Sequence, residues 1–153
     1  MVSMGMGWAI HIHILAAIAW IGGSIFMFAL GVTMTDKKAQ KAVYPHIGPI
    51  FGYFEVVALM FLLGTGSYMI TDYGLIELLF TDYHSEVIDA LRIKLWMVLV
   101  LLIVTVIHFV IALKTNNTER TRMEHLVSRA SSMLIFFLNL FVLHYAMVIR
   151  DIL

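Results

Sequence analysis

Four long apolar stretches constrain this chain more than any other feature of its sequence. They lie at about 7–33, 46–70, 92–113 and 127–149. Each is at least about 20 residues long, the length that an α-helix needs to cross a hydrocarbon core about 30 Å thick. Hydrophobic residues make up 61% of the chain and charged residues only 13%, against about 45–50% and about 25% in soluble domains. The sequence predicts an all-α fold: an integral membrane four-helix transmembrane bundle, one domain over residues 1–153.

Charge and cysteine content exclude several classes of function. Ten basic residues balance ten acidic ones, so the chain lacks the basic surface that a nucleic-acid-binding protein uses. It has no cysteine, which excludes disulfides, thiolate metal sites and cysteine nucleophiles.

The distribution of lysine and arginine predicts how the bundle is oriented. Seven basic residues lie after the first span and between the third and fourth spans, against three on the other side: Arg92, Lys94 and Arg150. Because basic residues favour the cytoplasmic side, we expect both termini on the non-cytoplasmic side of a bacterial inner (cytoplasmic) membrane. We expect Pro45 in the first turn of the second span. A short interfacial helix is expected within 76–89. The glycine-rich spans would also allow a homodimer.

Histidines inside the spans are the first candidates for chemistry, because polar groups in a bilayer are costly and mark functional sites. At about 1.5 Å per residue, His13 in the first span and His144 in the fourth lie at nearly the same depth. Two imidazoles at one level on facing helices can ligate one haem iron from both sides. We therefore expect His13 and His144 to be the axial ligands of a haem b.

His11 competes with His13 as a ligand, because residues two apart on a helix point in different directions. The face of His13 continues through small residues and Trp20, which would admit a flat cofactor, so His13 is preferred. On the other side of the membrane, His108 and His46 are the candidate ligands of a second haem. The structural alternative for His108 is a hydrogen bond to Ser132 or Thr105.

Three charged residues complete the candidate site. Glu55 is the only carboxylate within a span, and is a candidate proton carrier or quinone contact; its structural alternative is a buried acid bonded to Asn139. Arg92 and Lys94 open the third span at the depth of His13. We expect them to bind the haem propionates or an acidic substrate, the alternative being interfacial anchoring or a pair with Asp89.

Methionine and histidine near the N-terminus suggest a second metal. Met1, Met4 and Met6 precede His11 and His13, and thioether and imidazole ligands together suit copper(I). Copper binding or transport without haem is therefore an alternative function.

Two short motifs resemble a known superfamily. The run from His13 to Gly23 (HILAAIAWIGG) has a His, a Trp seven residues later and then glycines; the run Leu91–Trp96 (LRIKLW) has a basic residue and a Lys-Leu at the start of the third span. Both resemble motifs of the superfamily that groups the copper-resistance D-like (CopD-like) membrane proteins with the HemJ-like protoporphyrinogen oxidases. The resemblance implies that His13 is a haem b ligand and that Lys94 is a functional residue near the haem.

The expected function is that of a membrane b-type haem protein in electron transfer, as a cytochrome b or an oxidoreductase. Its partner is a quinol or quinone reaching the haem from the lipid bilayer, or a redox partner protein. Haem would supply the redox chemistry, while the helices supply axial ligands and exclude water. The alternatives are HemJ-like oxidation of protoporphyrinogen IX, with Glu55 and Lys94 as the candidate catalytic residues, and copper binding.

Overall fold

The computed structural model describes the backbone of residues 4–115 and 121–152, and the side chains of these residues except Met4, Met6 and His125. Its elements are α1 (Met4–Thr33), α2 (Lys37–Asp72), α3 (Leu75–Leu79), α4 (Glu86–Lys114) and α5 (Arg122–Ile152). The described residues contain no strand. Four of the helices, α1, α2, α4 and α5, are long and apolar enough to cross a membrane, which confirms the predicted fold.

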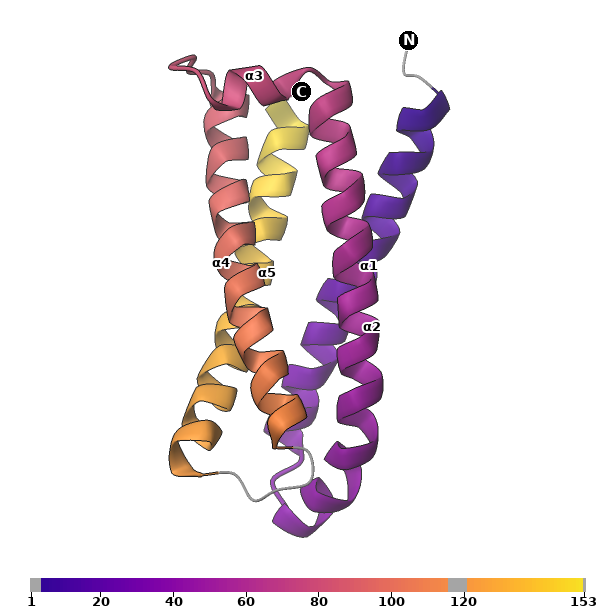
Figure 1. Ribbon diagram of the computed structural model, residues 1–153, viewed down its shortest axis with the longest axis vertical. Helices are drawn as coiled ribbons and strands as arrows, with labels where there is room; N and C mark the ends of the chain where they lie inside the picture. The colour runs from indigo at the N-terminus through magenta and orange to yellow at the C-terminus, as the bar shows by residue number, and fades with distance from the viewer. Residues whose placement is uncertain (1–3, 116–120, 153) are drawn as a thin grey trace.

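The helices extend beyond the apolar stretches that predicted them. α2 begins at Lys37 rather than near His46, because Asp36 caps it by accepting hydrogen bonds from the backbone N–H groups of Lys38 and Ala39. Pro45 therefore lies inside α2, not in its first turn. Figure 1 shows the N-terminal part of α2 turned away from the axis of the rest, as a proline within a helix favours.

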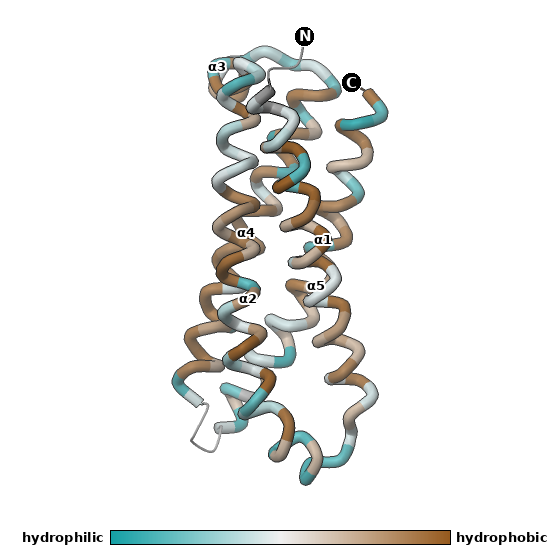
Figure 2. Tube along the Cα trace, turned by 90° about the vertical axis from the view of Figure 1, so that its right-hand side faces the viewer, coloured by the Kyte–Doolittle hydropathy of each residue, from teal (hydrophilic) through white to brown (hydrophobic). Residues whose placement is uncertain are grey.

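The bundle consists of two helical hairpins. α1 packs closely along α2, and α4 along α5, while α5 also contacts α1 and α2 touches α4 much less. The two termini and α3 lie at the same end (Figure 1), called the α3 end below. Apolar residues follow the middle of the long helices and hydrophilic residues gather toward both ends (Figure 2), as a bilayer requires.

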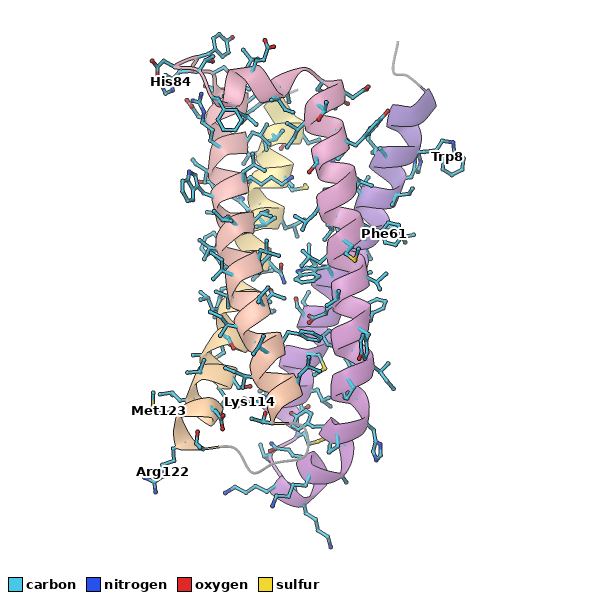
Figure 3. The ribbon with its side chains drawn as sticks, in the orientation of Figure 1. Trp8, Phe61, His84, Lys114, Arg122 and Met123 are labelled. Atoms are coloured by element: carbon cyan, nitrogen blue, oxygen red, sulfur yellow. The ribbon has the colours of Figure 1, made fainter. Side chains whose placement is uncertain are left out.

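The outside of the bundle carries many of its large apolar side chains. Trp8 points away from α1 and Phe61 lies on the exposed side of α2 (Figure 3). Such a surface is unfavourable in water and fits lipid contact, so the chain is a multi-pass membrane protein.

A polar contact joins the two hairpins in the middle of the bundle. Trp20 is 2% exposed, and its indole N–H donates to the Oδ1 atom of Asn139 over 2.9 Å. The Nδ2 atom of Asn139 donates to the hydroxyl of Ser24, also over 2.9 Å. Nearby, the rings of Phe28 and Phe136 stack with centroids 4.3 Å apart. Hydrogen bonds between buried side chains are a common way to hold transmembrane helices together.

Candidate functional site

His13 is held on the inner face of α1. Ala9, Ala16 and Trp20, which share that face, are all buried. The Nδ1 atom of His13 lies 2.8 Å from the hydroxyl oxygen of Thr65 on α2. That hydroxyl donates its proton to the backbone carbonyl of Phe61, so Nδ1 must be the donor to Thr65. In the neutral ring the Nε2 atom then carries the lone pair, which is the form of imidazole that binds a metal.

A glycine next to Thr65 makes room for the imidazole ring. A Cβ atom at Gly66 would lie 3.3 Å from the Cε1 atom of His13, tighter than most contacts of this kind. Thr65 and Gly66 thus fix the ring through one hydrogen bond and one close contact. A hydrogen bond to the second ring nitrogen is the usual support of a metal-binding histidine.

Lys94 on α4 faces the same part of the bundle. Its side chain is partly buried and shares a face of α4 with the buried residues Leu91 and Leu101, within electrostatic range of the His13 imidazole. Among the described residues, Lys94 has neither a hydrogen bond nor an ion pair. His13 from one hairpin and Lys94, a cation without a counter-ion among the described residues, from the other thus both face the interior of the bundle.

The structure does not place His144 opposite His13. The inward face of α5 carries the buried residues Ser131, Ile135 and Asn139. His144 follows Ile135 by nine residues, which is two and a half turns of a helix, so its ring is exposed on the far side of α5. Its described ring contact is with Tyr145, centroid to centroid 5.6 Å. Equal depth was the basis of the predicted pair, and depth does not determine the direction of a side chain.

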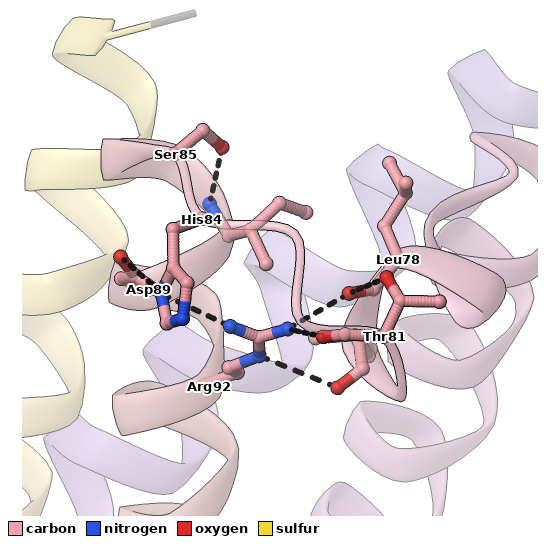
Figure 4. Close-up of polar contacts among 8 residues, drawn as sticks. Leu78, Thr81, His84, Ser85, Asp89 and Arg92 are labelled. Atoms are coloured by element: carbon pink, nitrogen blue, oxygen red, sulfur yellow. Dashed lines mark hydrogen bonds and ion pairs between the residues drawn. The ribbon is translucent and has the colours of Figure 1, made fainter.

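Arg92 does not point toward His13, contrary to its expected role with propionates. Its guanidinium group donates to the backbone carbonyls of Leu78, Leu79 and Thr81, and its Nη1 atom lies 3.1 Å from Asp89. Figure 4 shows this arrangement, in which the guanidinium group is surrounded by the end of α3 and its following turn. The pair with Asp89, which was the structural alternative, is present. Arg92 thus fastens α3 to α4.

Trp20 is part of the packing between α1 and α5. Its indole N–H donates to Asn139, so Trp20 has no free hydrogen-bond donor for the cofactor that it was predicted to bind. Asn139 is also not the partner of Glu55, because its amide contacts Trp20 and Ser24 instead. Glu55 has no hydrogen bond or ion pair within the described part of the chain.

His108, His46 and His11 have separate surroundings in the described part of the structure. The Nδ1 atom of His108 lies 2.8 Å from the hydroxyl of Ser131 on α5, so this contact is with Ser131 rather than with Ser132 or Thr105. His46 is exposed on α2, whereas His108 is partly buried. His11 is exposed too, with its Nδ1 atom 2.6 Å from the carbonyl of Gly7.

Metal clusters are absent from the part of the chain that the structure describes. No group of three or more His, Asp or Glu side chains there could hold a metal ion. Of the methionines in the copper hypothesis, Met1 and the side chains of Met4 and Met6 lie outside the described residues.

Sequence reasoning missed Thr65 and Gly66, although they position His13. The signal was the run Gly64-Thr65-Gly66, in which a single hydroxyl stands between two glycines inside a span. Small residues of this kind let helices approach closely, and a histidine on the neighbouring helix then has a hydroxyl within reach.

Comparisons with protein-family models, curated proteins and solved structures found no significant match to this chain.

Proposed function

We propose that this chain is a membrane b-type haem protein that transfers electrons, with a quinol or quinone in the bilayer as one partner. The observation that carries the proposal is the placement of His13: its Nδ1 atom is bonded to Thr65, so the neutral ring presents the Nε2 lone pair inside the bundle, with the Lys94 ammonium group within electrostatic range. A neutral imidazole held in this way is the common protein ligand of haem iron.

The residues of this chain fit that group through their chemistry. His13 would be the axial ligand, and Thr65 would fix its tautomer and ring plane. Lys94 would neutralise a propionate, because an anion in a dry environment needs a charge-assisted partner. The bound haem would supply the one-electron chemistry, while the helices exclude water from it.

One of the two alternative functions uses the same site. A porphyrinogen also carries propionates, so the cation of Lys94 beside His13 equally supports HemJ-like oxidation of protoporphyrinogen IX. Copper binding without haem relies on the N-terminal methionines instead.

Haem content tests the proposal and separates these alternatives. We expect the purified protein to contain one haem b per chain, His13→Ala to lose it, and the matched variant His108→Ala to keep it. A colourless protein that binds copper(I) would support the copper alternative, and a protein that oxidises protoporphyrinogen IX with an added quinone as electron acceptor would support the enzyme.

The orientation and location of the protein belong to the same proposal. The seven-to-three distribution of basic residues supports an α3 end on the non-cytoplasmic side of a bacterial inner membrane. His13 and Lys94 would then lie in the outer leaflet, within reach of a redox partner protein on that side.

A further inference from the structure

Glu55 lies on the inward face of α2. Gly52 and Ala58, three residues before and after it and therefore on the same side of the helix, are both buried. The carboxyl group is partly buried and has no hydrogen bond or ion pair among the described residues. A carboxyl group inside a membrane is costly and marks a functional site, and neither Trp20 nor Asn139 uses this one.

Thr105 on α4 offers a second polar group without a partner. The residue is 7% exposed, and its Oγ1 atom is the one buried side-chain oxygen or nitrogen of the described residues with no hydrogen-bond partner. Buried hydroxyls are almost always bonded, so an unbonded one is a candidate ligand contact.

A close contact between α2 and α4 places these two groups at the same level. A Cβ atom at Gly52 would lie 2.8 Å from the ring of Phe109, so these two residues oppose each other. The helices run in opposite directions (Figure 1). Moving one turn toward the α3 end therefore leads from Gly52 to Glu55 and from Phe109 to Thr105. An unpaired carboxyl on α2 and an unpaired hydroxyl on α4 thus stand at one level of the bundle, one turn from the contact between Gly52 and Phe109.

We propose that Glu55 and Thr105 bind the headgroup of a lipid-soluble quinol. A quinol hydroxyl would donate to the Glu55 carboxylate and the Thr105 hydroxyl would bond the same headgroup, while the flat ring packs against Phe109. The proposal rests on the proposed function for its choice of a quinol. Lateral entry from the lipid fits the bundle, because α2 and α4 touch each other much less than either touches its hairpin partner.

The opposite side of α2 does not offer the same chemistry. A shallow depression there is lined by Val57, Met60 and Phe61, and their apolar side chains give a headgroup no hydrogen bond. Thr105 lies eleven residues from Lys94 along α4, about 16 Å along the helix axis. The quinol site is therefore separate from the His13–Lys94 site and can be altered without touching it.

Equilibrium binding of decylubiquinol, kept reduced without oxygen, to the purified protein in detergent tests the site. Glu55→Leu and Thr105→Val should each weaken binding about tenfold or more, the usual effect of losing a hydrogen bond to a charged or buried group. Thr105→Ser keeps the hydroxyl and should bind like the unaltered protein. The matched controls Glu77→Leu and Thr71→Val make the same substitutions at exposed positions and should have no effect.

Several results would overturn this assignment. Equal affinity in Glu55→Leu and Thr105→Val, or no binding by the unaltered protein, would refute the quinol site. An azidoquinone label found on Val57, Met60 and Phe61 would also refute it, because the quinone would then bind on the other side of α2. A loss of ²²Na⁺ binding in the two variants, with unchanged decylubiquinol affinity, would refute it too, because the pair would then bind a cation and not a quinol. Haem content reports the proposed function separately: both variants should keep their haem, and a haem-free protein with Glu55-dependent quinol binding would refute the function but keep the site.

Discussion

At the scale of single residues, the candidate haem site consists of His13, Thr65 and Lys94. His13 and Lys94 could be chosen from the sequence, because a polar group within an apolar span is conspicuous. Thr65 is recognisable as the hydroxyl of the run Gly64-Thr65-Gly66, but its contact with His13 could not be predicted, since it depends on the rotation of α2 relative to α1. The directions of His144 and Arg92 were hidden for the same reason: Arg92 contacts backbone carbonyls, which leave no trace in a sequence.

Thr65→Val should loosen the haem without removing it. The substitution keeps the shape of the side chain and deletes the acceptor of the His13 Nδ1–H group, which fixes the ring orientation. Loss of such a supporting bond typically costs 10–100-fold in metal affinity. Haem release to apomyoglobin measures this, with Thr71→Val as the control; an equal release rate in both variants would contradict the role of Thr65.

Lys94→Met should lower the midpoint potential of the haem. The variant keeps the apolar stem and deletes a positive charge that favours the reduced haem. A charge at about 10 Å, in a protein of effective dielectric constant about 20, shifts the midpoint potential by some tens of millivolts. Arg92→Met should shift it less, because that guanidinium group lies at the end of α3. A potentiometric titration in which Lys94→Met leaves the potential unchanged would contradict the placement of Lys94.

At the scale of helices, caps and buried polar contacts explain what hydropathy alone could not predict. The apolar stretches located four helices correctly, but Asp36 and Ser85 begin α2 and α4 earlier through side-chain caps. The Trp20–Asn139 bond was also hidden, because it joins residues 119 positions apart.

Arg92→Met should free α3 from α4. The variant loses the pair with Asp89 and three hydrogen bonds from the guanidinium group to backbone carbonyls. Hydrogen bonds from a charged group contribute about 1.5–3 kcal/mol each when buried. Because Arg92 is partly exposed, each contributes less stabilisation here. Backbone amides in 75–85 should exchange with deuterium faster, while haem content stays the same. Loss of haem without faster amide exchange would contradict this role and would support binding of the haem propionates by Arg92.

At the scale of the whole molecule, the bundle is two hairpins joined by α1–α5 contacts, with its termini at the α3 end. Antiparallel packing of four spans follows from the sequence, but the side of the membrane depends on the charge distribution alone. The absence of cysteine makes that orientation simple to test.

Single cysteines should report an α3 end that faces outward. In intact cells, a membrane-impermeant maleimide should label Asp82→Cys, in the turn after α3, and leave Lys38→Cys unlabelled until the cells are opened. The reverse pattern would invert the bundle and place the His13 site in the cytoplasmic leaflet.

The most direct test of the central claim is rescue of a cavity at His13. In His13→Gly the axial ligand and its ring are removed, so the purified protein should lose its haem and with it the Soret absorption. Imidazole added together with haem should occupy the space beside Thr65 and restore the Soret band of a histidine-ligated haem, while His108→Gly should need no rescue. An unchanged haem content and Soret band in His13→Gly without imidazole would show that His13 does not bind the haem iron and would contradict the proposed function.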